Sequence, residues 1–116
     1  MKKKLIAAIT AAAILALPSG TGLAADIEEE DRARFGMGKS YNNMREFKKA
    51  QEALSGLYER YEDNEEVAFE YAKALGYGGR PEKALEILRR LRKASPGDGQ
   101  LDMTYVTVLE ANQMFE

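Results

Sequence analysis

A spacing of 34 residues recurs along this chain and constrains its fold more than any other feature. Each of two units has a small residue, a large residue three positions on, an alanine twelve positions on and a leucine sixteen positions on: Gly38, Tyr41, Ala50 and Leu54, then Ala72, Leu75, Ala84 and Leu88. Within each unit the apolar residues recur at steps of three and four, which is typical of one face of a helix. The pattern therefore predicts two helical hairpins of the same design.

The same residues resemble the tetratricopeptide repeat, a 34-residue helical hairpin with a small residue, a tyrosine, an alanine and a closing proline at fixed places. Pro96 supplies the closing proline of the second unit. The chain departs from the family pattern at Arg34 and Ala68, which stand where its tryptophan is expected, and at Glu62, which replaces the first proline.

This resemblance implies an all-α fold of antiparallel helical hairpins, stacked as a short α-solenoid of two repeats and a C-terminal capping helix. Tyr105 lies 34 residues after Tyr71 and begins a third unit. The expected boundaries are about 31–64 for the first repeat, 65–98 for the second and 99–116 for the capping helix. For function, the resemblance implies only a scaffold that binds a protein or peptide, since unrelated systems use such folds.

Polar residues and one proline predict where the helices begin. Asp26 and Asp63 each have a glutamate three residues later, so both fit the capping box of a helix start. Pro81 fits the first position of a helix, where its missing N–H costs nothing. Asp98 is the expected cap of the last segment.

Asparagine and glycine predict where helices end. The first helix is expected to run to about Tyr41, with Asn42 and Asn43 as its exit, because Asn tolerates the left-handed backbone that ends helices. Gly78 and Gly79 are the expected end of the third helix.

The last segment, residues 100–116, carries two conflicting signals. Val106, Thr107 and Val108 are β-branched and belong to an alternating stretch that would suit a strand. Leu101 and Tyr105 also lie on one helical face. The 34-residue register favours a helix, since a lone strand would have no sheet to join.

The first 25 residues have the order of a secretory signal peptide. Lys2 to Lys4 are basic, residues 5–17 are apolar apart from Thr10, and cleavage is expected after Ala24 or Ala25. The apolar run is shorter than the roughly 20 residues that a membrane-spanning helix needs. We therefore predict an exported protein of bacterial type that is located in the periplasm and has no membrane insertion after cleavage.

The charge balance argues against two classes of partner. Removing Lys2, Lys3 and Lys4 would take the 17 basic residues to 14 against 19 acidic ones, a net charge of −5. A mildly acidic chain is a poor match for nucleic acid or anionic lipid, which both favour a basic patch. Because the chain contains no cysteine, it has no disulfide and no lipid attachment through Cys.

The residue types that most enzymes use are missing. The chain has no His, Cys or Trp, which removes the commonest nucleophile–base pairs, proton shuttles and zinc ligands. We expect no catalytic residues, no metal site and no cofactor.

Stacked hairpins curve, and the first helix of each pair lines the concave side. By the family register, the residues expected to face a bound segment are Arg32, Phe35, Lys39 and Asn43 in the first unit, Phe69, Lys73 and Tyr77 in the second and Met103 in the third. The same register also places Asn42, Glu66 and Gln100 on this lining.

Two residue types recur at the same place of this groove. Phe35 and Phe69 share one register position, and Lys39 and Lys73 share another. Rings alternating with ammonium groups suit an extended or helical segment with apolar and acidic side chains. Packing of the two phenylalanines against neighbouring helices is an equally good interpretation.

The sequence thus predicts a non-catalytic protein–protein interaction scaffold or adaptor in the cell envelope. The alternative is a self-assembling structural subunit that dimerises or polymerises through exposed repeat faces, since such arrays usually need three or more units. A third interpretation is a piece of a longer array. The family's subclass that grips a chain-terminal carboxylate is poorly matched, because the fifth place holds Phe, Phe and Met.

Overall fold

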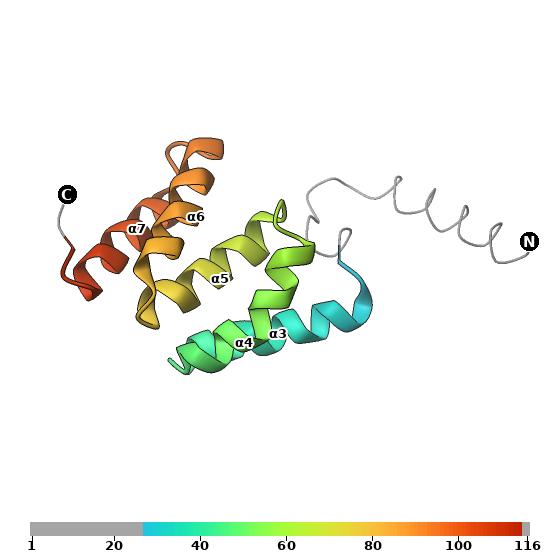
Figure 1. Ribbon diagram of the computed structural model, residues 1–116. Helices are drawn as coiled ribbons and strands as arrows, with labels where there is room; N and C mark the ends of the chain where they lie inside the picture. Colours follow the sequence, from blue (N-terminus) through green and yellow to red (C-terminus); the bar gives the residue numbers. More distant parts are fainter. Residues whose placement is uncertain (1–26, 115–116) are drawn as a thin grey trace, which may run out of the picture.

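The computed structural model describes residues 27–114, in which five helices follow one another as stacked antiparallel hairpins (Figure 1). The helices are α3 (Glu29–Asn43), α4 (Phe47–Arg60), α5 (Glu65–Tyr77), α6 (Pro81–Ala94) and α7 (Gly99–Ala111). The predicted all-α fold is confirmed. The last segment forms a helix, as the repeat register predicts, and not the strand that its β-branched residues would also suit. The predicted signal peptide and the Asp26 cap lie outside the described residues.

Small residues let the two helices of each hairpin approach closely. Ala50 in α4 and Ala84 in α6 are both 0% exposed, as their shared register position predicts. Gly38 in α3 is buried beneath α4, and a Cβ atom added there would lie 2.4 Å from Cδ2 of Leu54. The small residues of the 34-residue pattern are thus the positions where the backbone of one helix packs closely against side chains of its partner helix.

The hydrophobic core consists of two clusters, and α5 contributes to both. The first cluster joins α5 to the first hairpin and contains Ile27, Phe35, Ala50, Leu54, Leu57, Val67 and Ala74. The second joins α5 to α6 and α7 and contains Ala68, Ala72, Leu75, Ala84, Leu85, Ile87, Leu88, Leu91, Leu101, Tyr105 and Val108. Burying a leucine side chain completely stabilises a fold by about 1.5–3 kcal/mol.

Two side chains cap helix starts in the described residues. Oδ1 of Asn64 accepts a hydrogen bond from the N–H of Val67 at the start of α5, so the prediction that Asp63 is the cap is wrong by one residue. Oδ1 of Asp98 accepts from the N–H groups of Gln100 and Leu101, which confirms its predicted role at α7. Such caps contribute roughly 0.5–2 kcal/mol each.

The exit of α3 differs from the prediction. The residue with left-handed backbone is Arg45, at a φ of 61°, and not Asn42 or Asn43, which both remain in the helix. Asn42 is 7% exposed because its amide is held by α5. The predicted break at Gly78 and Gly79 is confirmed, with Gly79 at a φ of 91°.

The last helix ends earlier than its predicted boundary at residue 116. Nδ2 of Asn112 donates to the carbonyl oxygens of Val108 and Gly76, both at 2.8 Å, and Gln113 then takes a φ of 55°. The amide of Asn112 therefore closes α7 and ties its end to α5.

Asp31 fastens the start of α3 to the end of α4. Its carboxylate lies 2.8 Å from Nη2 of Arg60 and accepts a 2.7 Å hydrogen bond from the hydroxyl of Tyr61. The hydrogen bond from Tyr61, with the nearby Arg60 charge, lowers the pKa of Asp31 below its ordinary value of 3.8. The same bond raises the pKa of Tyr61 above 10.0.

Candidate functional site

A hollow of about 250 Å³ lies between α3, α5 and the start of α7. Its lining consists of Phe35, Lys39, Glu66, Phe69, Glu70 and Gln100. Phe35, Lys39 and Phe69 are therefore brought together as the repeat register predicts, and Glu66 and Gln100 lie on the same lining. We call this space the groove hollow.

The two repeats place the same pair of side chains beside the groove hollow. Nζ of Lys39 lies 5.5 Å from the centre of the Phe35 ring, and Nζ of Lys73 lies 5.1 Å from the centre of the Phe69 ring. The two members of each pair are four positions apart, which places both on one face of a helix. An ammonium over a ring at this distance is worth about 0.5–1 kcal/mol at an exposed site.

The two phenylalanines differ in depth. Phe35 is 3% exposed and belongs to the first core cluster, so packing against neighbouring helices accounts for its ring. Phe69 is only partly buried against the second cluster. A bound segment would therefore contact the Phe69 ring directly, whereas the buried Phe35 ring would contact the Lys39 ammonium above it rather than the segment.

Glu70, on the lining of the groove hollow, pairs with Lys73, which is not itself on that lining, and this pair was not predicted from the sequence. Glu70 lies 3.3 Å from Nζ of Lys73, and its Oε1 and backbone oxygen both accept from Nδ2 of Asn42, at 2.9 and 3.0 Å. Oδ1 of Asn42 is buried and has no hydrogen-bond partner in the structure. The spacing of Glu70 three residues before Lys73 is the sequence signal that could have identified this pair.

The other predicted groove residues do not line the groove hollow. The Tyr77 ring packs 5.5 Å from that of Phe47, and its hydroxyl shares a hydrogen bond with Thr107. Met103 is 69% exposed on α7. Arg32 and Asn43 are exposed on α3.

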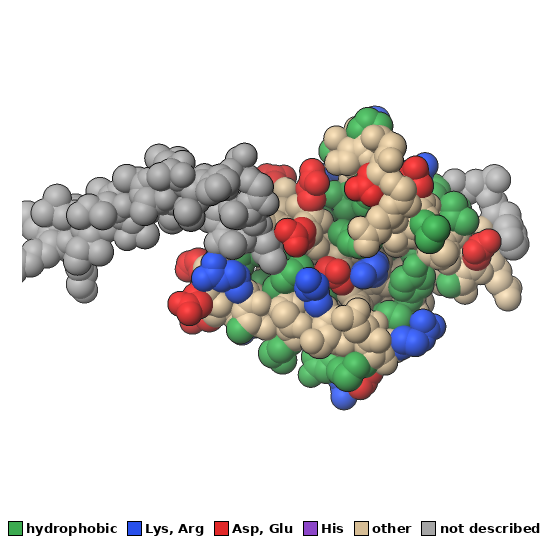
Figure 2. Space-filling model, turned by 180° about the vertical axis from the view of Figure 1, so that it is seen from behind, with side chains coloured by type: hydrophobic (Ala, Val, Ile, Leu, Met, Phe, Trp, Pro, Cys, Tyr) green, Lys and Arg blue, Asp and Glu red, His purple; other side chains and the backbone are tan. Residues whose placement is uncertain are grey.

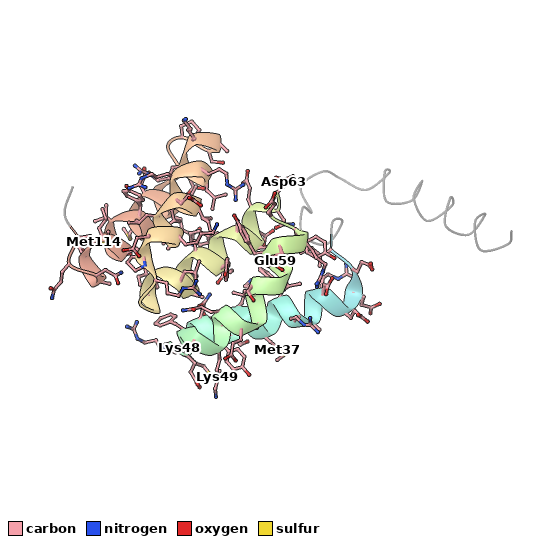
Figure 3. The ribbon with its side chains drawn as sticks, in the orientation of Figure 1. Met37, Lys48, Lys49, Glu59, Asp63 and Met114 are labelled. Carbon is pink, nitrogen blue, oxygen red and sulfur yellow. The ribbon has the colours of Figure 1, made fainter. Side chains whose placement is uncertain are left out.

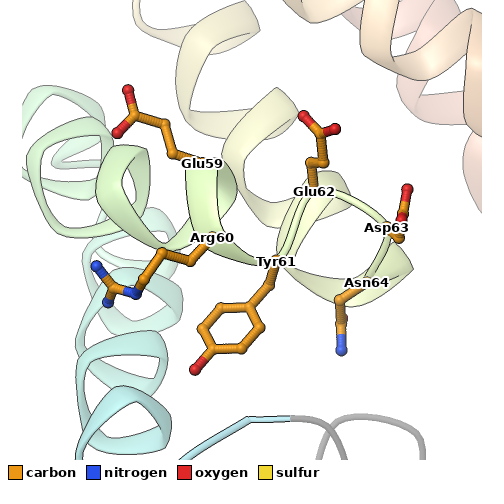
Figure 4. A pocket seen from close by; sticks show the side chains of 6 residues that line it. All are labelled: Glu59, Arg60, Tyr61, Glu62, Asp63 and Asn64. Carbon is orange, nitrogen blue, oxygen red and sulfur yellow. The ribbon is translucent and has the colours of Figure 1, made fainter.

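A second hollow, of about 400 Å³, lies at the α4–α5 connection and is lined by six consecutive residues, 59–64 (Figure 4). Arg60 and Tyr61 hold Asp31, and Asn64 caps α5. Because these side chains already have structural roles and come from one connection, this hollow carries no functional assignment.

The surface of the described residues mixes the two signs of charge. Figure 2 shows acidic and basic side chains interspersed with hydrophobic ones over one face of the molecule. Within residues 27–114, no cluster of three or more acidic groups is arranged to hold a metal ion. None of the helices α3 to α7 is long and apolar enough to span a bilayer.

Stacked hairpins with a hollow between their first helices define a helical-repeat scaffold. The sequence profile of the tetratricopeptide repeat matches residues 43–105, more than half of the 116 residues. The chain belongs to the tetratricopeptide repeat family, whose members are typically non-catalytic scaffolds for protein–protein interaction. No curated protein and no solved structure matches the chain.

Proposed function

We propose that the protein holds a segment of another protein of the cell envelope in the groove hollow, without catalysis. The observation that carries this proposal is the repeated phenylalanine–lysine pair, at Phe35 and Lys39 and again at Phe69 and Lys73, beside one hollow. The two pairs sit on consecutive first helices, which are the elements that line the concave side of such arrays.

The chemistry of the groove hollow favours a segment with both apolar and charged side chains. The exposed part of the Phe69 ring offers apolar contact, and Lys39 offers a cation for a carboxylate. Glu66 and Glu70 line the same hollow, so a partner with a basic side chain next to an acidic one fits better than a uniformly acidic partner.

The envelope location is part of the proposal and is supported by the order of residues 1–25. A basic start, an apolar run and small residues before Ala24 and Ala25 are typical of a cleaved export signal. Mass measurement of the protein recovered from cells tests this part. A mature chain that begins at Ala25 or Asp26 is expected, and a chain that keeps residues 1–25 would contradict it.

The binding proposal is tested by capturing partners from envelope extract on immobilised residues 26–116. Phe69→Ala removes the ring, and Lys73→Glu reverses the charge beside it; both are expected to reduce the amount of captured partner. Lys83→Glu is the matched control, because Lys83 lies in the first turn of α6, where it contacts Glu86 and the Tyr58 ring and does not line the groove hollow. If Phe69→Ala and Lys73→Glu capture the same partners as Lys83→Glu, the groove assignment is wrong.

A further inference from the structure

Exposed hydrophobic surface is concentrated at the two ends of the array. Among the described residues, the large hydrophobic side chains that are exposed are Met37 (53%), Met44 (58%), Met103 (69%) and Val106 (48%). Met37 lies on α3 and Met44 directly follows it, whereas Met103 and Val106 lie on α7. Figure 1 shows α3 and α7 at opposite ends, with α5 between them.

The repeat register indicates that, within residues 27–114, the α3 surface lacks the preceding helix that its counterparts in the later units contact. Met37 occupies the place of Tyr71 and Tyr105 in the later units. Tyr71 stacks on Tyr58 of the preceding hairpin at 5.1 Å, and the hydroxyl of Tyr105 accepts from Nε of Arg89 of the preceding hairpin. Met37 points away from α5 (Figure 3). We call the surface formed by Met37 and Met44 the head face.

The same reasoning applies to the other end. Val106 occupies the place of Gly38 and Ala72, which their hairpin partners bury completely or almost completely. Val106 is instead 48% exposed, and Met103 beside it is 69% exposed. We call the surface formed by these two residues the tail face.

The charges that border the two faces are opposite. α7 contains Asp102 and Glu110 and has no lysine or arginine. Lys48 and Lys49 lie in the first turn of α4, which has no acidic residue. Nζ of Lys49 is 5.9 Å from the centre of the Tyr41 ring, about one turn along α3 from Met37, so a basic charge borders the head face. Lys49 is 3.1 Å from Glu46, and Asp102 is 2.9 Å from Arg92, but such exposed pairs are worth at most about 1 kcal/mol and leave both faces able to rearrange.

We propose that the tail face of one copy binds the head face of a second copy, so that the chain assembles head to tail. Methionine is adaptable and is enriched at protein interfaces, which suits both faces. Pairing of two tail faces is disfavoured, because it would bring Asp102 and Glu110 of both copies together. Since the head and tail faces differ, the contact is heterologous and extends to further copies unless it closes into a ring.

The test uses two variants that each block one end, in the chain as it is recovered after export. Met37→Asp blocks the head face, and Val106→Asp blocks the tail face. Both positions are exposed, so the fold is expected to be retained, which circular dichroism checks. By sedimentation, the wild-type mass is expected to rise with concentration, and each variant alone is expected to associate at least about tenfold more weakly, because a carboxylate is costly in an apolar contact.

Mixing the two variants separates head-to-tail assembly from any other kind. The intact tail face of Met37→Asp can bind the intact head face of Val106→Asp, so an equal mixture is expected to form dimers and nothing larger. A wild type that stays monomeric, variants that still assemble alone, or a mixture that forms no dimer would each overturn the proposal. Phe69→Ala is expected to assemble as the wild type does, because Phe69 lies in the groove hollow and on neither face.

Discussion

The close contact between α3 and α4 at Gly38 gives a sharp test of the packing described above. A methyl group at position 38 would lie 2.4 Å from Cδ2, 2.5 Å from Cγ and 3.0 Å from Cδ1 of Leu54. Leu54 is 0% exposed and belongs to the first core cluster, so it has little room to move. Gly38→Ala therefore requires α4 or the Leu54 side chain to shift.

Two opposing effects set the size of the change. Overpacking a well-packed core by a methyl group costs about 1–3 kcal/mol. Replacing glycine by alanine inside a helix contributes about 0.8–1.0 kcal/mol in the other direction. We therefore expect Gly38→Ala to lower the free energy of unfolding by up to about 2 kcal/mol.

Gly36 supplies the matched control on the same helix. A Cβ atom at this position meets nothing within 4 Å, so Gly36→Ala is expected to gain the helix propensity alone, about 0.8–1.0 kcal/mol. Urea unfolding followed by circular dichroism measures both variants. A 1 kcal/mol change shifts the midpoint temperature of a domain of this size by roughly 4–8 °C. Equal stabilisation by the two substitutions would refute the close approach at Gly38.

Three further outcomes follow from the structure. Asn64→Ala removes the cap of α5 and is expected to cost about 0.5–2 kcal/mol of unfolding free energy, whereas Asp63→Ala is expected to have little effect; urea unfolding of the two variants checks this. Gly76→Ala places a Cβ 2.6 Å from a methyl of Val108 and, after the same gain in helix propensity is subtracted, is expected to lower the free energy of unfolding by up to about 2 kcal/mol, which thermal unfolding measures. Because the pKa of Asp31 is lowered in the fold, the stabilisation from its ionised carboxylate is present above the unfolded pKa near 3.8 and is lost as pH falls through the folded pKa. Because the pKa of Tyr61 is raised, the stabilisation from its protonated hydroxyl is present below its ordinary pKa of about 10 and is lost as pH rises through the folded pKa. Tyr61→Phe is expected to reduce the dependence of the unfolding midpoint on pH in both ranges, and an unchanged dependence would contradict the Asp31–Tyr61 bond.

The sequence predicts the helices and their pairing because the apolar spacing is set by packing that repeats. Ala50 and Ala84 lie in equivalent contacts, and the register of α7 correctly outweighed the β-branched residues near Val106. The wrong predictions concern helix ends, where either of two neighbouring polar side chains could accept the hydrogen bond that caps the helix. The cap of α5 is Asn64 and not the predicted Asp63, and the left-handed backbone after α3 is at Arg45 and not at Asn42.

The candidate site was predictable only in the part that repeats. Phe69 and Lys39 fall on the groove hollow because their register positions fix the helix face. The repeat register does not predict how deeply a side chain is buried. The burial of Phe35 and the partial exposure of Phe69 depend on how the neighbouring helices pack, which only the structure shows. The link from Asn42 to Glu70 joins residues 28 positions apart, and no periodic pattern indicates it.

The place of α5 in both core clusters has a consequence for how the molecule opens. Val67 and Ala74 pack toward α3 and α4, and Ala72 and Leu75 pack toward α6 and α7. Neither pair of helices can separate from α5 without exposing one side of this central helix. Backbone amides of α5 are therefore expected to exchange with solvent deuterium only when the whole molecule unfolds, while those near the outer ends of α3 and α7 exchange through local fraying.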